Sequence, residues 1–242
     1  MKIGIIADIH ANLAAFTATL EDLAAQNVQE IISLGDNIGY GPDPEQVVDA
    51  LLDHNVLSVL GNHEYALQSD RYLQKLNPSP RKSLLLNRDL LSEENLVHCV
   101  NLPQVLLRHE ARFVHGCPPK SPSAYLYRPS DHKLEKLYTG FKEQICFYGH
   151  THAFGHYDYD GTTYQTQTAG IGECTLNDQW RHINNVGSVG QPRDGKNNQA
   201  KYGLWDTETN KLEIRSLAYD IETTVSLLKE LGFHGTNASR LL

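Results

Sequence analysis

Cysteine is scarce in this sequence, and its spacing excludes two kinds of small stabilised domain. The 242 residues include four cysteines and no CxxC pair: Cys99, Cys117, Cys146 and Cys174. Such spacing argues against a structural zinc finger and against a disulfide-stapled secreted domain. We therefore expect free thiols in a reducing compartment.

Basic charge and long apolar runs are also lacking. Lysine and arginine total 21 against 29 aspartates and glutamates, a net charge of −8, which excludes a broad basic face for nucleic acid. The first apolar run stops at Asp8, and no later segment reaches the ~18 apolar residues of a membrane span. Hydrophobic residues still make up 40% of the chain, so we expect a folded, cytoplasmic protein.

Histidine, in contrast, is abundant. The chain contains 12 histidines. Because histidine is costly to bury and is a common metal ligand, the surplus calls for a search for pairs at ligand spacing.

The first part of the chain alternates apolar strands with amphipathic helices. Strands are predicted at 2–7, 31–34 and 56–60, and helices at 13–26 and 44–53. Strand and helix in alternation imply right-handed crossovers and a parallel core sheet. This part therefore indicates an α/β fold.

Two inserts interrupt the strand pattern further along. Residues 65–101 are predicted to be helical, and residues 117–140 contain a Pro- and Ser-rich stretch and a short helix. Both are expected to cap the edge of the sheet and to shape the substrate pocket. Strands are predicted at 112–115 and 145–148 around the second insert.

The last part of the chain has the pattern of antiparallel strands. Asp160-Gly161 marks one hairpin turn, a second hairpin is predicted within 202–217, and a helix at 221–231 closes the chain. We predict a single domain over 1–242, of class α/β, with two stacked mixed β-sheets flanked by helices.

Polar side chains follow five of the predicted strands. Because the carboxyl ends of parallel strands meet at one edge, these side chains are expected to lie together. Nitrogen and oxygen donors without repeated thiolates suit divalent Mn, Fe or Zn. The five blocks are Asp8-Ile9-His10, Gly35-Asp36-Asn37, Gly61-Asn62-His63-Glu64, His115-Gly116 and Gly149-His150-Thr151-His152.

These blocks, in this order, resemble the calcineurin-like metallophosphoesterase family. The resemblance covers residues 8–152 and extends through 185–193. It implies a four-layer α/β/β/α sandwich and hydrolysis of phosphate mono- or diesters. The stretches 35–42 and 187–193 are most similar to prokaryotic members associated with diadenosine tetraphosphatase or phosphoprotein phosphatase activity.

The resemblance also implies roles for individual residues. A first metal ion would be held by Asp8, His10, Asp36 and His152, and a second by Asp36, Asn62, His115 and His150. The ions would be divalent or trivalent, and a hydroxide between them would attack phosphorus in line. Catalytic roles fall to Asp36, Asn62 and His63, with His63 as acid and transition-state stabiliser.

The sequence departs from the family at one position that bears on His63. The family often has a second carboxylate three residues after the aspartate of its second block, and here that position is Gly39. Asp43 and Glu64 are the nearby acids that could orient His63 instead. Asn37, Tyr40 and Arg193 are candidates for substrate contact, with a purely structural role in their loops as the alternative.

Other interpretations remain open. Helix capping is the alternative role for Asp8, Asp36 and Asn62, since each follows a strand. A non-catalytic scaffold that binds a partner protein and a mononuclear hydrolase of non-phosphate esters are the alternative functions. Phosphoproteins and dinucleoside polyphosphates are further substrate classes. The remaining histidines have no partner at ligand spacing and are predicted to be ordinary: His54, His98, His109, His132, His156, His182 and His234.

Overall fold

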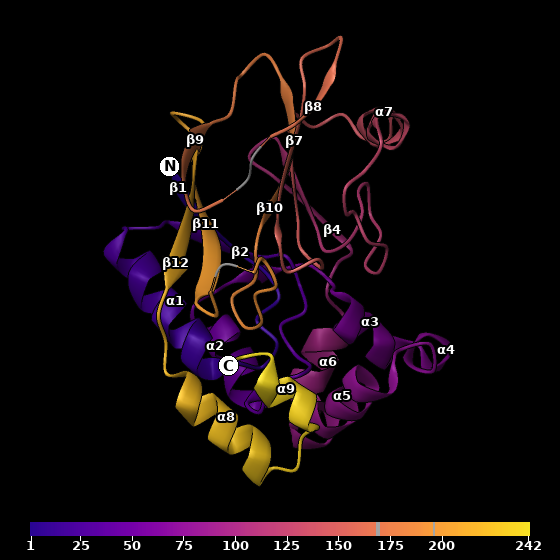
Figure 1. The fold of residues 1–242 in the computed structure, drawn as a ribbon, viewed down its shortest axis with the longest axis vertical. Coiled ribbons are helices and arrows are strands. Elements are labelled where there is room, and N and C mark those ends of the chain that lie inside the picture. The colour runs from indigo at the N-terminus through magenta and orange to yellow at the C-terminus, as the bar shows by residue number, and fades with distance from the viewer. Residues whose placement is uncertain (168–169, 196) are drawn as a thin grey trace.

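The computed structural model describes residues 1–167, 170–195 and 197–242, and these fold into two facing β-sheets with helices on the outside (Figure 1). The first sheet has the order β3-β2-β1-β11-β12-β9 and the second has the order β4-β5-β6-β10-β7-β8. The strands of the first sheet are β1 (Lys2–Ile6), β2 (Glu30–Ser33), β3 (Leu57–Ser58), β9 (Gly172–Thr175), β11 (Ala200–Asp206) and β12 (Lys211–Leu217). Those of the second are β4 (Val105–Arg108), β5 (Ala111–Val114), β6 (Ile145–Tyr148), β7 (Phe154–Tyr159), β8 (Tyr164–Thr166) and β10 (Arg181–Val186).

Parallel pairing places several strand ends at one edge of the molecule. β1 runs parallel to β2, and β2 to β3, while β5 and β10 both run parallel to β6. β11, β12 and β7 pair antiparallel to their neighbours, so both sheets are mixed. The loops that follow β1, β2, β3, β5 and β6 therefore emerge together.

An apolar layer joins the two sheets. Ile3 and Ile5 of β1 point into it, together with Phe113, Phe147 and Trp205, and all five are buried. Because side chains alternate along a strand, Ile6 faces the other way, toward the outer helices. This layer fixes the first sheet against the second and so sets the distance between their loops.

Helices cover the outer faces and gather at one end. α1 (Leu13–Ala25) and α2 (Pro44–Asp53) pack on the first sheet, and α8 (Ile221–Glu230) lies along α1. Gly4 allows the close approach of α1, since a Cβ there would lie 2.4 Å from Leu23. α7 (Asp131–Thr139) packs on the outer face of the second sheet. The other helices lie at the end of the sheets (Figure 1): α3 (Asn62–Gln68), α4 (Asp70–Leu73), α5 (Pro78–Leu90), α6 (Glu93–Val100) and α9 (Gly235–Ser239).

The predicted α/β class with two stacked mixed sheets flanked by helices is confirmed. The helix at 44–53 and the strand at 145–148 have the predicted bounds, and both predicted hairpins form. β4 was missed because it is a half-exposed edge strand with little apolar alternation. β10 was missed because it is a buried strand that carries His182, Asn184 and Asn185, so it lacks an apolar run.

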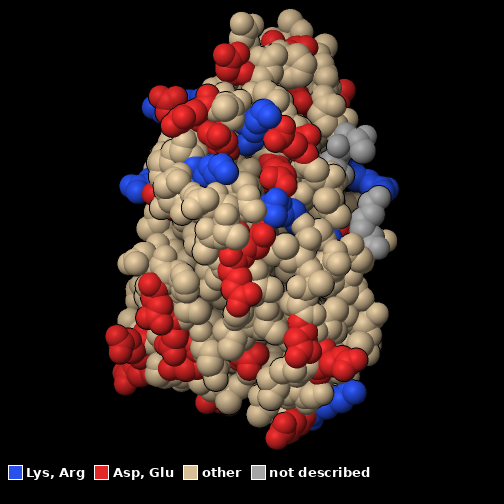
Figure 2. Space-filling model, turned by 90° about the vertical axis from the view of Figure 1, so that its left-hand side faces the viewer, with Lys and Arg blue, Asp and Glu red and all other residues tan. Residues whose placement is uncertain are grey.

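The cysteines and the surface charge agree with the composition. All four cysteines are free thiols, of which Cys99, Cys117 and Cys146 are buried. On the face shown in Figure 2, acidic side chains predominate and the basic ones lie among them. The longest described helices have 13 residues, and no helix in the described ranges could span a membrane.

Candidate metal centre

Five of the candidate ligands in the loops after the strands hold their backbone in the left-handed region. They are Asp8 (φ 53°), His10 (52°), Asp36 (53°), His150 (68°) and His152 (56°). For residues other than glycine this conformation costs about 1–2 kcal/mol each, so neighbouring contacts must hold it in place. Hydrogen bonds between loops do this, since the N–H groups of Asp8 and His10 donate to carbonyls in the loop after β2.

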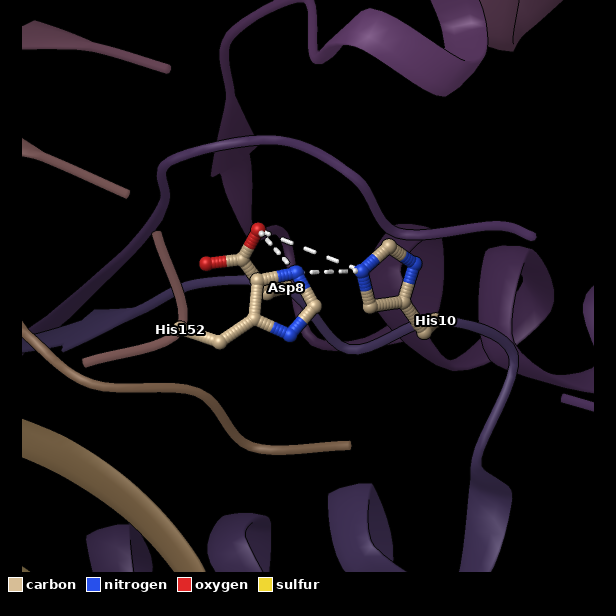
Figure 3. Close-up of side chains that lie close together, drawn as sticks. All are labelled: Asp8, His10 and His152. Atoms are coloured by element: carbon tan, nitrogen blue, oxygen red, sulfur yellow. Dashed lines mark hydrogen bonds and ion pairs between the residues drawn. The ribbon is translucent and has the colours of Figure 1, made fainter. Parts of the chain in front are cut away.

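The first group of ligand-type side chains joins the two sheets. Asp8 and His10 come from the loop after β1, and His152 comes from the loop after β6 (Figure 3). The Nε2 atoms of His10 and His152 lie 3.0 Å apart, and Asp8 Oδ1 lies 3.5 Å from His152 Nε2. All three side chains are buried. Three donor atoms thus converge on one place, as a metal ion requires.

The second group consists of Asp36, His115 and His150 and lies beside the first, with Asp36 close to both. Asp36 Oδ2 is 3.3 Å from His115 Nε2 and 3.8 Å from His10 Nε2. His115 Nε2 is also 3.1 Å from Asn62 Oδ1 and 3.2 Å from His150 Nδ1. The Asp36 carboxylate therefore lies between the two groups.

The outward ring nitrogen of each of these histidines meets a backbone carbonyl. His10 Nδ1 is 3.1 Å from the Ile38 oxygen and His115 Nδ1 is 2.8 Å from the Leu34 oxygen. The same holds for His152 Nδ1 with Gln191, at 2.6 Å, and for His150 Nε2 with Ser123, at 3.2 Å. Such contacts fix the tautomer, so the inward nitrogen carries the lone pair that a metal needs. The donor set therefore fits metal binding.

Burial and mutual charge shift the pKa values of these groups in opposite directions. Burial raises the pKa of Asp8 to about 7 and lowers that of His150 to about 3. Burial also lowers the pKa of His152. For His115 burial acts in the same direction, but the Asp36 carboxylate outweighs it and raises the pKa to about 9. Burial lowers the pKa of His10 as well, so His10, His150 and His152 all favour the neutral form, in which histidine binds metal.

His63 lies against Gly39, and this explains the departure from the family pattern. A Cβ on Gly39 would lie 1.9 Å from His63 Nδ1, and Gly39 has φ +91°, so a side chain here would collide with the ring. His63 Nδ1 has no hydrogen-bond partner among the described residues, while Nε2 lies 3.9 Å from Asp36 Oδ2. The rings of His10 and Tyr40 contact His63, each with centroids 4.9 Å away. Ring packing holds the His63 imidazole, and the Asp36 carboxylate holds its main chain, since the His63 N–H donates to Asp36 Oδ1 at 2.8 Å.

Glu64 has a different partner from the one that the sequence suggested. Its buried carboxylate accepts the backbone N–H groups of Asp36, Asn37, Ile38 and Gly61. Glu64 therefore shapes the loop that carries Asp36 and does not orient His63. Sequence reasoning could not find this role, because the partners are main-chain atoms that no residue pattern records.

The three candidates for substrate contact lie in different surroundings. The Asn37 side chain is buried and makes its hydrogen bonds with Ser33 and Ser58. The Tyr40 ring lies 4.6 Å from the His10 ring. Arg193 is exposed, and its guanidinium lies 5.7 Å from the Tyr40 ring. Burial is the main cause that lowers the pKa of His63, and the positive charge of Arg193 is a smaller cause in the same direction. Tyr40 and Arg193 therefore stand beside the metal-ligand groups, and Asn37 does not.

Residues at the end of β10 and directly after it also support the centre. Asn185 Nδ2 donates to the Gly149 oxygen at 2.8 Å and to Thr151 Oγ1 at 3.0 Å. Ser188 Oγ donates to the Asp8 oxygen at 2.9 Å. These bonds hold the loops that carry the ligands of both sheets.

The two predicted inserts reach the centre through particular residues. From 65–101, Asn87 of α5 accepts the Gly39 N–H and donates to the Gly41 oxygen at 2.9 Å. From 117–140, the Tyr125 ring stacks on His150 at 3.9 Å and is 63% exposed. α7, in the same insert, packs instead on the outer face of the second sheet.

Comparison with known proteins agrees with this geometry. The profile of the calcineurin-like phosphoesterase superfamily domain matches residues 1–210. An uncharacterized protein of Methanocaldococcus jannaschii is 32% identical over 224 residues, which cover 91% of this chain and 88% of that protein.

Two solved structures are similar over nearly their whole length. The metallophosphoesterase from Sphaerobacter thermophilus has a TM-score of 0.85 and 31% identity, covering 100% of this chain and 98% of that one. A hypothetical protein from Pyrococcus horikoshii OT3 has a TM-score of 0.80 and 19% identity, covering 99% and 97%, and shows the same fold.

Proposed function

Because the chain belongs to the calcineurin-like phosphoesterase superfamily, we propose that it hydrolyses phosphate mono- or diesters at a centre of two metal ions. One observation carries the proposal. Buried nitrogen and oxygen donors from loops of both sheets converge in two groups, with the Asp36 carboxylate between them. A site for helix caps or surface polar groups would not need this convergence.

We assign the ligands to the two ions as the family resemblance implies. Asp8, His10, Asp36 and His152 would hold the first ion, and Asp36, Asn62, His115 and His150 the second. This donor set of imidazole, carboxylate and amide oxygen suits Mn, Fe or Zn. When bound, such a pair supplies positive charge for the phosphate and an acidified water as the nucleophile.

His63 has the position of a group that acts on the substrate. Its Nε2 faces Asp36 at 3.9 Å, yet neither ligand set needs it. From there its N–H can stabilise charge on the phosphoryl oxygens and pass a proton to the leaving oxygen.

Arg193 and the rings of Tyr40 and Tyr125 would contact the remainder of the substrate. Arg193 offers a cation to an anionic ester on a protein of net charge −8. The exposed Tyr125 ring, stacked on His150, offers an apolar face to a leaving group. A substrate screen should therefore include phosphopeptides and dinucleoside polyphosphates beside simple esters.

The test compares His63→Asn with His54→Asn, a control at an exposed histidine that ends α2 outside the centre. Each protein is loaded with Mn²⁺ and assayed with 4-nitrophenyl phosphate and bis(4-nitrophenyl) phosphate. We expect kcat to fall by about 10²–10⁴-fold in His63→Asn, with metal content and the control unchanged. If the wild type hydrolysed neither ester with any divalent metal, the proposal would be refuted.

The same experiment separates the alternative functions. A partner-binding scaffold would show no metal-dependent hydrolysis, and His63→Asn would not weaken its complex. A mononuclear hydrolase would hold one ion per chain and prefer carboxylic esters. Metal analysis with a paired panel of phosphate and carboxylic esters distinguishes these outcomes.

A further inference from the structure

A second cluster of ligand-type side chains lies on the inner face of the second sheet, away from the centre described above. β7 and β10 pair antiparallel, and the pair Phe154 and Val186 packs in the apolar layer between the sheets. Side chains two residues apart share a face. The same face therefore continues with two polar cross-strand pairs, which are His156 with Asn184 and Asp158 with His182.

Three donor atoms of this cluster converge. His182 Nδ1 lies 2.6 Å from Asp158 Oδ1, and His156 Nε2 lies 2.8 Å from the same oxygen. The three atoms lie within 4.8 Å of one another. Asp158 and His182 are buried, and His156 is half-buried. The sequence predicted both histidines to be ordinary residues without a nearby ligand partner, whereas the structure brings them together at Asp158.

His182 has the same arrangement as the histidines of the first centre. Its Nε2 lies 2.9 Å from the Asn177 carbonyl oxygen, the position of an N–H donor. The Nδ1 of a neutral ring is then an acceptor that faces a carboxylate oxygen, and two acceptors at 2.6 Å require a cation between them. That cation is either a proton or a metal ion.

The position of His156 favours a metal ion. A shared proton links two atoms, whereas His156 brings a third donor to the same oxygen. His156 Nε2 is 2.8 Å from Asp158 Oδ1 but is not aligned as a hydrogen bond. Three donor atoms gathered at one place, two of them on the same carboxylate oxygen, are typical of metal coordination.

A cavity of about 240 Å³ adjoins the cluster and contains a second sign of a ligand. His156, Cys174 and Asn184 line it, from strands of both sheets. The Asn184 side chain is 1% exposed, and neither its Nδ2 nor its Oδ1 has a hydrogen-bond partner in the described part of the chain. Buried amides are costly to leave unpaired, so this side chain is suited to hold water beside an ion.

We propose that His156 Nε2, Asp158 Oδ1 and His182 Nδ1 form a further metal site, with a fourth coordination position open to the cavity. Two imidazoles and one carboxylate suit a borderline divalent ion, and Zn²⁺ binds in this way with water as its fourth ligand. The site ties β7 to β10. It is separate from the first centre, because His182 lies four residues before the end of β10, about 13 Å along the strand.

The test locates zinc directly. Crystals of the full chain soaked in Zn²⁺ are measured at the zinc absorption edge, and metal content per chain is determined for wild type, Asp158→Asn and His182→Ala. His132→Ala, an exposed histidine on α7, serves as control. We expect an anomalous peak between the three donor atoms, and one ion fewer per chain in both cluster variants but not in the control.

Asp158→Asn keeps the shape of the side chain, so it remains informative if His182→Ala does not fold. A map with no peak among the three atoms at saturating Zn²⁺ overturns the proposal, as does unchanged metal content in Asp158→Asn. The anomalous map shows metal bound at each of the two centres separately. A first centre that bound no metal would therefore leave this result interpretable.

Discussion

Gly39→Ala tests whether close packing against a glycine holds His63 in its working position. The new Cβ would lie 1.9 Å from His63 Nδ1, whereas an ordinary contact is about 3.5 Å, so ring or backbone must move by roughly 1.5 Å. Since a misplacement of ~1 Å can cost about 100-fold in rate, we expect kcat to fall by about 100-fold. Metal content should stay the same, because His63 is not in either proposed ligand set.

The substitution also affects stability, by an amount that can be worked out separately. At φ +91° an alanine costs about 1–2 kcal/mol, and the collision adds about 1–3 kcal/mol. We expect the thermal midpoint to fall by roughly 5–15 °C, measured by differential scanning fluorimetry.

Gly232→Ala is the matched control. Gly232 has φ +74°, but a Cβ there would meet nothing within 4 Å, so it carries the conformational cost without a collision. Its stability should fall by about 1–2 kcal/mol with kcat unchanged. If Gly39→Ala kept kcat within about threefold of wild type while folded and metal-loaded, the reasoning about His63 would be refuted.

Four further results are expected. Glu64→Gln leaves at least one buried N–H of the Asp36 loop facing an amide NH₂, so unfolding free energy should fall by about 1–3 kcal/mol; an unchanged melting curve with and without Mn²⁺ would contradict this. Arg193→Ala should raise KM for phosphate esters about tenfold with little change in kcat, and an unaltered KM would remove Arg193 from the substrate site. Burial raises the pKa of Asp22, but hydrogen bonds from Arg215 outweigh it and lower the pKa, so this carboxylate stabilises the fold above its unfolded pKa and ceases to do so as pH falls through the folded value. Asp22→Asn should therefore be about 1–2 kcal/mol less stable than wild type at pH 7 and equal to it near pH 2, by urea unfolding at both pH values. Chelation should lower the thermal midpoint and abolish hydrolysis, with both restored by Mn²⁺, since each ion stabilises by about 2.7 kcal/mol at 100 times its Kd.

The sequence predicted that the polar side chains of the centre lie together because their signal is local. Asp8 and His10 follow an apolar strand directly, and so do His150 and His152, so strand prediction alone placed them at one edge. The confirmed family and fold rest on the same order of blocks.

What the sequence could not predict depends on contacts between distant segments. The collision that excludes a carboxylate at Gly39 exists because α3 carries His63 against that loop. The cluster of His156, Asp158 and His182 depends on the register between β7 and β10, which a residue pattern does not specify. His156 and Asp158 have the same two-residue spacing as Asp8 and His10, but they lie within a strand rather than after one.

The division of the ligands between two sheets has a consequence for biosynthesis. The first proposed ligand is Asp8 and the last is His152, and β1 pairs with β11, which ends at residue 206. A chain emerging from the ribosome therefore lacks the proposed ligands of the second sheet until most of it has been made. Metal binding should therefore occur late, after the two sheets have folded together. A chain truncated before β11 should bind metal ions weakly even though it contains every proposed ligand.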